Sequence, residues 1–533
     1  MTSAPSNLLV PNAERWPVDS DDPVIELVDV SISFGGNVVL DGLNLRILPG
    51  KTTVICGRSG SGKSVLLKLM MGLHPPDSGK VIAFGQDLAE LKPTEIIELR
   101  KRMSMMFQNY ALFDSLDVEN NVGFSLLENT KMRRAEIMEL AHDLLHILDL
   151  PKTEHLLPSE LSGGMRKRVS LARALISNPE VVLFDEPTTG LDPLMVEKVD
   201  EMLLLARQKY HITSAIISHD MASAKRLADR IAFLHGGKII FTGSYDEFHR
   251  SDLPSVRSFI EGAQTSRLSR TDVSGTWDRI EDPATAQPPP VVELVNVHKS
   301  FGDNHVLRGL DLKIPRGKIT VLIGASGSGK SVIVRHIMGL FKPDSGEIRV
   351  FGQDIAEFKD EEMVAIRRHF GMVFQHAALL DWLTVAENVA FPLREREKLP
   401  RPEIRERVAE TLERLHIADI ADKLPGTISS GQQKRTALAR AIITHPEVMI
   451  YDEPTTGQDP IRTRQVDDMI VEAQEQFDIT SIVISHDMAS TFRIGHVIAL
   501  LHQGKIAAYG DPEAVRATDN DYVQHFIYAG SVE

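Results

Sequence analysis

Short apolar segments alternate with longer amphipathic ones along most of this chain. Residues 52–56, 181–184 and 216–217 are apolar or β-branched, and glycine, aspartate or serine follows each run. Runs of this kind predict buried strands of a parallel sheet, whereas residues 65–71 and 166–176 have the length and pattern of helices. The pattern therefore predicts an α/β protein, with a further strand near residues 23–30.

The whole pattern occurs twice, with an offset of 267 residues. Residue 34 corresponds to residue 301, and the offset holds without net insertion as far as His219 and its counterpart His486. Two tandem copies of one unit explain this self-similarity. We expect domains at residues 23–262 and 291–533, a mobile leader at 1–22 and a Pro/Ser/Thr-rich linker at 263–290.

Composition narrows the class of protein. A chain of 533 residues is too long for one hydrophobic core and suits two α/β domains. The net charge of −15 argues against a mainly electrostatic hold on nucleic acid, so we expect no nucleic-acid partner. Cys56 is the only cysteine, which excludes an internal disulfide. No apolar run reaches 18 residues, so we expect no membrane span, and the first 20 residues do not resemble a secretion signal.

A glycine-rich loop follows the predicted strand at 52–56 and precedes a predicted helix. Such a loop turns successive backbone N–H groups toward phosphate oxygens, while its lysine reaches the β- and γ-phosphates and its last serine offers a hydroxyl to Mg²⁺. A Gly-Ser turn that matches by chance is the alternative. The two copies of G-x-x-x-x-G-K-[ST] are Gly57, Arg58, Ser59, Gly60, Ser61, Gly62, Lys63 and Ser64, and Gly324, Ala325, Ser326, Gly327, Ser328, Gly329, Lys330 and Ser331.

Two carboxylates end a buried apolar run in each copy. They are Asp185 and Glu186 in the first, and Asp452 and Glu453 in the second. Parallel strands deliver such residues to a nucleotide crevice, where we expect the aspartates to hold Mg²⁺ and the glutamates to orient and deprotonate the attacking water. A solvated strand end is the alternative, but the sequence Pro-Thr-Thr-Gly-Leu-Asp at 187–192 strengthens the match.

Three further pairs of side chains are candidates for the nucleotide site. The glutamines would touch Mg²⁺ and the attacking water, the histidines would sense the γ-phosphate, and the aromatic rings would stack on adenine. The alternatives are a structural histidine at a strand end and an ordinary core aromatic. The pairs are Gln108 and Gln375, His219 and His486, and Phe34 and Phe301.

A Ser-Gly-Gly turn precedes the long helix predicted at 166–176. A hydroxyl, backbone N–H groups and the positive end of a helix together favour an anion, although the turn could also be an ordinary N-cap. The two turns comprise Ser162, Gly163 and Gly164, and Ser429, Ser430 and Gly431.

In this order and in two copies, the motifs resemble those of ABC ATPases over residues 23–262 and 291–533. The resemblance implies two tandem P-loop NTPase domains, each with a RecA-like core, an antiparallel β subdomain and a helical signature subdomain. It implies ATP and Mg²⁺ as cofactors. It also implies a head-to-tail sandwich, in which each ATP lies between one domain's phosphate loop and the other's signature turn. A linker of about 28 residues spans roughly 30 Å and stretches to about 90 Å, which allows pairing within one chain.

A narrower resemblance is to the ATPase of Mla/Mce-type phospholipid transporters. It implies work at the cytoplasmic face of a bacterial inner membrane, with a separate integral permease and MCE-type lipid-binding proteins. Fusion of two such domains departs from the usual separate subunits, which leaves the stoichiometry of partners open. The segments that carry the resemblance are residues 103–108, 111–116, 158–166, 385–393 and 457–460.

A second departure is chemical, because Ser430 replaces the glycine found at 163. The serine would crowd the γ-phosphate or occupy a backbone conformation that needs glycine, unless it is simply tolerated. The affected site would pair Lys63 with Ser429, and the other would pair Lys330 with Ser162. We therefore predict two unequal sites.

Other functions stay open at this point. A ribosome-binding translation factor with paired ABC domains is expected to carry a long charged helical hairpin, which the Pro-rich segment does not match, and a DNA-repair ATPase would need zinc-type cysteines. A tandem ATPase for another cargo, such as a sugar or a peptide, fits the motifs. For contact with a permease we expect residues 110–113 and 376–380, including Leu112 and Leu379, although core packing is the alternative.

Overall fold

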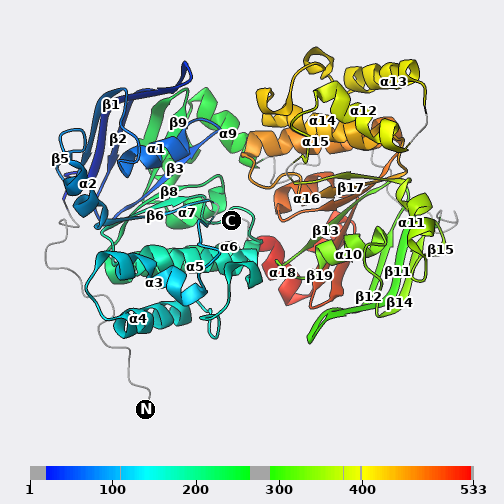
Figure 1. Ribbon diagram of the computed structural model, residues 1–533, viewed down its shortest axis with the longest axis horizontal. Coiled ribbons are helices and arrows are strands. Elements are labelled where there is room, and N and C mark those ends of the chain that lie inside the picture. The colour runs from blue at the N-terminus through cyan, green and yellow to red at the C-terminus, as the bar shows by residue number, and fades with distance from the viewer. Residues whose placement is uncertain (1–19, 109, 265–288, 376, 397–398, 530–533) are drawn as a thin grey trace. The chain divides into compact units, whose positions relative to one another are not determined.

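A computed structural model describes residues 20–108, 110–264, 289–375, 377–396 and 399–529 of the chain. Within it the chain forms two compact units, divided between Glu261 and Gly262 (Figure 1). Most of the predicted leader at 1–22 and of the predicted linker at 263–290 lies outside the described residues, so both stay predictions.

A six-stranded sheet forms the centre of the first unit. Its order is β10-β9-β3-β8-β7-β6, and all neighbours run parallel except β10, which pairs antiparallel with β9. The central strands are buried along their whole length, as expected where both faces of a parallel sheet are covered. The strands are β3 (Thr52–Gly57), β6 (Met103–Met106), β7 (Val181–Asp185), β8 (Thr213–Ile217), β9 (Arg230–His235) and β10 (Lys238–Gly243).

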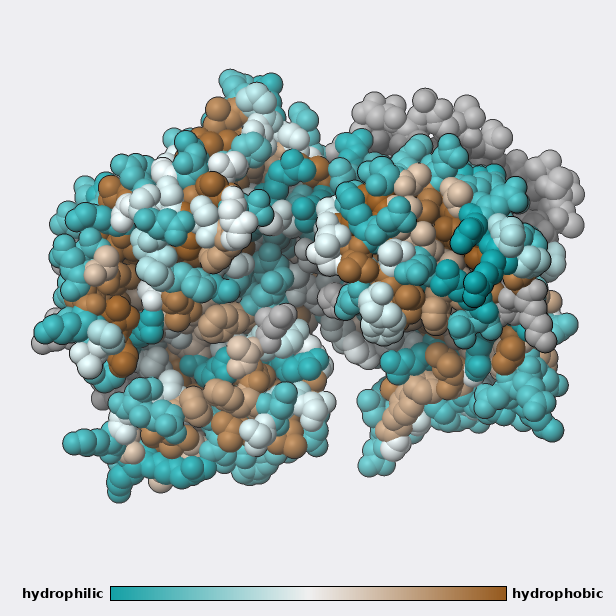
Figure 2. All heavy atoms as spheres, turned by 45° about the horizontal axis from the view of Figure 1, so that its top comes forward, coloured by the Kyte–Doolittle hydropathy of each residue, from teal (hydrophilic) through white to brown (hydrophobic). Residues whose placement is uncertain are grey.

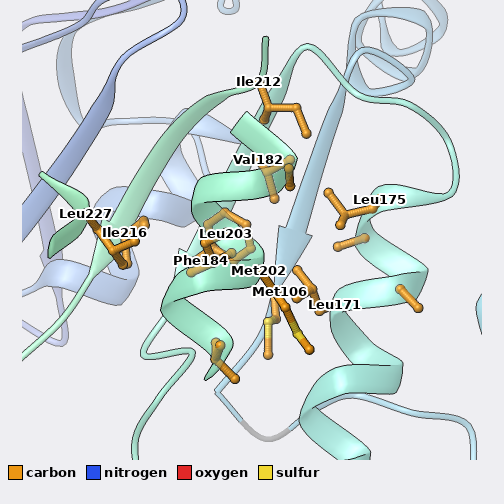
Figure 3. Close-up of a cluster of buried hydrophobic side chains, with 14 of the residues drawn as sticks. Met106, Leu171, Leu175, Val182, Phe184, Met202, Leu203, Ile212, Ile216 and Leu227 are labelled. Carbon is orange, nitrogen blue, oxygen red and sulfur yellow. The ribbon is translucent and has the colours of Figure 1, made fainter. Parts of the chain in front are cut away.

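Alternate residues of these strands point into two separate hydrophobic cores. Val182 and Phe184 of β7 pack with Leu171 of α5 and Met202 of α6 in one core (Figure 3). Val181, next to them in the same strand, belongs to the other core, which also contains α1. The helices of this unit are α1 (Lys63–Met70), α2 (Pro93–Arg100), α3 (Val118–Asn129), α4 (Arg134–Ile147), α5 (Gly163–Leu175), α6 (Pro193–Tyr210), α7 (Met221–Leu227), α8 (Tyr245–His249) and α9 (Pro254–Gln264).

An antiparallel sheet of order β2-β1-β4-β5 covers the second of these cores. Toward its end β2 alternates buried and exposed residues, with Leu43, Leu45 and Ile47 turned inward, as in a strand with one solvated face. Its strands are β1 (Ile25–Phe34), β2 (Asn37–Ile47), β4 (Ser78–Ala83) and β5 (Gln86–Asp87). Cys56 in β3 is fully buried, as its place in an apolar run indicated, and burial raises the pKa of its thiol to about 12.

The second unit repeats the first, with sheets of order β16-β17-β18-β13-β19-β20 and β12-β11-β14-β15. Its strands are β11 (Val292–Phe301), β12 (Asn304–Ile314), β13 (Ile319–Gly324), β14 (Ser345–Val350), β15 (Gln353–Asp354), β16 (Phe370–Val373), β17 (Val448–Asp452), β18 (Thr480–Ile484), β19 (Val497–His502) and β20 (Lys505–Gly510). Its helices are α10 (Lys330–Ile337), α11 (Asp360–Arg367), α12 (Val385–Arg396), α13 (Arg401–Arg414), α14 (Ser430–Ile442), α15 (Pro460–Phe477), α16 (Met488–Ile494), α17 (Pro512–Arg516) and α18 (Asp521–Tyr528).

The predicted fold class is confirmed: each unit combines an α/β core, an antiparallel sheet and a helical part formed by α3 to α5 or α12 to α14. The helix expected at 166–176 begins earlier, at Gly163, because Ser162 caps it by accepting a hydrogen bond from the Met165 backbone N–H at 3.2 Å. Among the described residues, we find no helix with the length and apolar character that a membrane span requires. On the face shown in Figure 2, apolar and polar residues are interspersed.

Candidate active sites

The phosphate loops have the backbone conformation that their glycines predict. Gly57 has φ 154°, and a Cβ at this position would lie 2.4 Å from the carbonyl oxygen of Leu234 in β9, so a side chain does not fit. Gly62 precedes α1 with φ 99°. Gly324 and Gly329 repeat these values at 148° and 109° in the second unit. Between these glycines lie Ser59, Gly60 and Ser61, or Ser326, Gly327 and Ser328.

Each loop folds around its own lysine. Lys63 is 5% exposed, and its Nζ donates to the carbonyl oxygens of Gly57 and Arg58, both at 2.9 Å. Lys330 donates to the corresponding carbonyls at 2.7 and 3.0 Å. Each loop thus holds a buried ammonium group between two of its own carbonyl oxygens, and a positive charge is what a triphosphate requires.

Two hydroxyls in the loops support the same conclusion. The Oγ atoms of Ser61 and Ser328 are buried, and neither has a hydrogen-bond partner within the described part of the chain. A buried hydroxyl without a partner is costly, and a bound oxygen acceptor would satisfy it. The serine hydroxyl at this matching position in each loop is therefore suited to bind a phosphate oxygen.

The residues present also fit Mg²⁺. The strand β7 ends at Asp185 beside the start of α1, and Ser64 Oγ donates to Asp185 Oδ1 at 3.2 Å. Burial, helped by the neighbouring carboxylate of Glu186, raises the pKa of Asp185. The pKa of Asp452 is raised for the same two reasons, and Ser331 begins the matching α10. A carboxylate and a hydroxyl are hard oxygen ligands, and a cation beside them would offset the cost of the buried charge.

Glu186 is the centre of a small polar cluster in the first unit. Gln108 Nε2 donates to its Oε2 at 2.9 Å, and Thr189 Oγ1 donates to the same oxygen at 3.0 Å. His219 Nε2 lies 2.9 Å from Oε1. Glu186 follows β7 with φ 53°, a left-handed conformation that is strained for glutamate. The structure thus brings together Gln108, Glu186 and His219, three residues that lie far apart in the sequence.

The second unit repeats the histidine and threonine contacts of this cluster around Glu453. His486 Nε2 lies 2.5 Å from its Oε1, and Thr456 Oγ1 donates to Oε2 at 3.3 Å. The backbone of Glu453 has φ 51°. Gln375 follows β16 as Gln108 follows β6, and it is half-buried.

Both glutamates are held in the ionised form. Burial alone would raise the pKa of Glu186, but the hydrogen bond and charge of His219, with Thr189 and Lys63, bring it below its usual value. The same balance of burial against His486 and Lys330 lowers the pKa of Glu453. An ionised, buried carboxylate beside a histidine has the properties of a general base.

The signature serines cap their helices. Ser162 Oγ accepts from the Met165 N–H, and Ser429 Oγ accepts from the Gln432 N–H at 3.3 Å, with the Gln432 side chain returning a bond to the Ser429 N–H at 2.9 Å. The polar contacts of both serines are thus with the first turn of their own helices. Gly164 and Gly431 are the second residues of these helices.

The expectation that residue 430 needs a glycine backbone is wrong. Gly163 and Ser430 each begin a helix with ordinary helical geometry, and neither has a positive φ. A Cβ on Gly163 would have the Tyr110 hydroxyl 3.6 Å away as its nearest atom, which is an ordinary contact distance. Serine at this position is therefore sterically acceptable within its own unit.

The phenylalanines are not core residues. Phe34 and Phe301 end β1 and β11 and are 45% and 44% exposed. Phe34 meets the ring of His74 edge-on at 6.0 Å, and Phe301 meets Phe341 at 5.4 Å. Their exposed faces are consistent with stacking on a base.

Sequence reasoning missed two buried lysines that occupy matching positions in the two units, Lys167 and Lys434. Lys167 Nζ donates to the carbonyl of Thr189 and, at 3.5 Å, to that of Glu186, whereas Lys434 donates to the carbonyl of Pro454. Burial lowers their pKa values to about 7 and about 8. The apolar residues four positions later on the same helix face, Leu171 and Leu438, were the available signal.

The chain is similar to several known proteins. A family model described as "ABC transporter" matches residues 40–189 and 307–456. The glutathione import ATP-binding protein GsiA of Escherichia coli O6:H1 is 30% identical over 520 residues, covering 89% of this chain and 83% of that protein. GsiA of Shigella boydii serotype 4 is 29% identical over the same shares. The solved structure of cbiO1 from Clostridium perfringens, part of the ABC transporter complex cbiONQ, is 30% identical and covers 45% of this chain and 96% of its own, with a TM-score of 0.41.

Proposed function

The chain belongs to the ABC transporter family and is the subunit of such a transporter that binds and hydrolyses ATP. We propose that its two glutamate-centred sites drive a membrane permease that transports lipid. The observation that supports the catalytic part is the convergence of Gln108, His219 and Thr189 on the buried carboxylate of Glu186. The family uses ATP with Mg²⁺ and works with a separate permease.

We propose specific roles for the clustered side chains. Lys63 and the loop N–H groups bind the triphosphate, and Ser64 with Asp185 would hold Mg²⁺, which supplies charge neutralisation when bound. Glu186 accepts a proton from water because its carboxylate is ionised and its second oxygen is oriented by Thr189 and Gln108. His219 keeps Oε1 in place and would report the state of the γ-phosphate. Lys330, Ser331, Asp452, Glu453, Gln375 and His486 do the same in the second unit, and Phe34 and Phe301 would stack on the two adenines.

We further propose that the two units pair head to tail within the chain. The support is chemical: each signature serine presents a hydroxyl and a helix N-terminus, and its polar contacts are with its own helix rather than with its own phosphate loop. In this arrangement Ser162 completes the pocket of Lys330, and Ser429 completes that of Lys63.

For the cargo we propose a phospholipid or related lipid, handled at the cytoplasmic face of a bacterial inner membrane with MCE-type partners. The support is the resemblance in residues 103–108, 158–166 and 457–460. A second candidate, import of a small peptide, is favoured by the similarity to GsiA over 89% of the chain. The translation-factor alternative has no support from the relatives reported above.

The test is isolation of the full chain with its native membrane partners. The complex is placed in phospholipid vesicles, and ATP-dependent transfer of a fluorescent phospholipid is compared with uptake of glutathione. Glu186→Gln/Glu453→Gln protein is the control for ATP dependence. We expect lipid bound to the complex and ATP-dependent lipid transfer. Glutathione uptake without lipid transfer would contradict the lipid proposal, and co-purification with ribosomes rather than a permease would contradict the transport role.

A further inference from the structure

The two signature turns differ at several positions, and three of these differences are in mutual contact range of the turn's first helical residues. In the first unit a glycine at the turn is accompanied by a tyrosine and a methionine, and in the second a serine is accompanied by an alanine and an arginine. The corresponding sets are Gly163, Tyr110 and Met195, and Ser430, Ala377 and Arg462. The three differences lie around one turn, which suggests that they compensate for one another.

In the first unit the side chains nearest the two glycines of the turn are uncharged. The Tyr110 hydroxyl lies 3.6 Å from the position of a Cβ on Gly163, and Met195 Cε lies 3.6 Å from the position of a Cβ on Gly164. The guanidinium of Arg166 stands over the Tyr110 ring, 5.4 Å from its centre. Close packing by tyrosine and methionine thus surrounds the first signature turn.

In the second unit the turn is held by a charge-assisted hydrogen bond. Arg462 Nη1 donates to Ser430 Oγ at 3.2 Å, and Arg462 Nε lies 3.6 Å from Oδ2 of Asp459, whose side chain is fully buried. Asp459 also caps α15 by accepting from the N–H groups of Ile461 and Arg462. Arg462 therefore ties the first residue of α14 to the loop that precedes α15.

We propose that Arg462 is a positioning residue specific to the second signature turn, holding Ser429 and Ser430 in place through the Ser430 hydroxyl. The inference rests on the proposed function, in which this turn completes the pocket of Lys63. Hydrolysis in that pocket then depends on the bond between Arg462 and Ser430. The pocket of Lys330 has no such dependence, because Met195 stands at the matching position.

The test is a double-mutant cycle with Arg462→Met and Ser430→Gly in the full chain. Each change introduces the residue that the first unit carries at the matching position, so we expect the fold to tolerate it. Single-turnover hydrolysis is measured in a Lys330→Ala background, which leaves the Lys63 pocket, and in a Lys63→Ala background as the matched control. Ser430→Thr keeps the hydroxyl and should retain the rate.

In the Lys330→Ala background we expect each single change to lower the rate constant about fivefold, with half-saturating ATP changed less than about twofold. The double change should lower the rate constant about fivefold in total rather than about 25-fold, because both single changes remove the same hydrogen bond. Losses that multiply, or losses equal in the two backgrounds, would overturn the inference.

Amide hydrogen exchange gives a second readout that does not depend on activity. Arg462→Met should speed exchange at residues 430–434 and leave exchange at residues 163–167 of the first unit unchanged. Unchanged exchange in Arg462→Met overturns the inference even if hydrolysis is altered. An unmodified chain that does not hydrolyse ATP, or a Glu186→Gln/Glu453→Gln protein that still does, contradicts the proposed function and the inference with it.

Discussion

At the scale of single residues, the proposed chemistry depends on two glutamates that stay ionised although they are buried. Burial would raise their pKa values, but each has a histidine within 3 Å of one oxygen and a threonine hydroxyl donating to the other. The left-handed backbone at Glu186 and Glu453 positions both oxygens for these contacts and is strained for a residue with a Cβ. Such strain is typical of residues with a functional constraint.

The depressed glutamate pKa predicts how activity depends on pH. The folded-state pKa lies below the ordinary 4.5, so the base stays charged as pH falls toward that value. We expect kcat/KM for ATP to change less than about twofold between about pH 6.5 and about pH 5.5, a range below the pKa values of Lys167 and Lys434. A loss of kcat/KM with its midpoint inside this range, in protein that circular dichroism shows to be folded, would contradict this assignment.

The two phosphate-loop lysines should not be equivalent. Because the second signature turn carries Ser430 and Arg462 where the first carries Gly163 and Met195, the pockets that they complete differ. We expect residual single-turnover rates of Lys63→Ala and Lys330→Ala proteins to differ by at least about threefold, with nucleotide occupancy measured in parallel. Equal rates at equal occupancy would show that the pockets are equivalent.

At the scale of elements, the strand, loop and helix around each phosphate site were predictable, because their signals are local in sequence. Gly57 to Ser64, and Asp185 with Glu186, follow strands that their apolar runs identify. The start of α5 was placed too late, since capping by Ser162 outweighs the weak helix propensity of two glycines. The bond between Arg462 and Ser430 joins residues 32 apart on different helices, so only the packing of α14 against α15 reveals it.

The segment after the glutamine is the element proposed to contact the permease. Leu112 is half-buried against the core, so the better probes are its exposed neighbour Phe113 (43% exposed) and Trp382 (75% exposed). Leu379 is also half-buried. We expect Phe113→Asp or Trp382→Asp to reduce permease-stimulated hydrolysis at least about fivefold, as loss of an interface anchor does, with basal hydrolysis retained.

The matched control is Leu205→Glu. Leu205 is 62% exposed on α6, and the second unit has Glu472 at the corresponding position. This change should leave the stimulation intact. If it reduces stimulation as much as Trp382→Asp does, the effect is not specific to the proposed surface.

At the scale of the whole molecule, the tandem repeat gives one chain two sets of candidate catalytic groups. The offset of 267 residues placed each candidate predicted in the first unit at a matching position in the second. The repeat could not predict where matching residues make different contacts. Lys167 and Lys434 are an example, because their ammonium groups donate hydrogen bonds to different carbonyl oxygens. Cargo likewise follows from neither motif nor fold, because the groups described here handle only the nucleotide.

The most direct test of the account is steady-state ATP hydrolysis by the Glu186→Gln/Glu453→Gln protein, with ATP binding measured on the same sample. The two changes remove the carboxylates and keep their shape. We predict that hydrolysis falls about 10²–10⁴-fold while ATP still binds, since only the base is lost. Near-normal turnover in this protein would contradict the central claim that the two glutamates activate water.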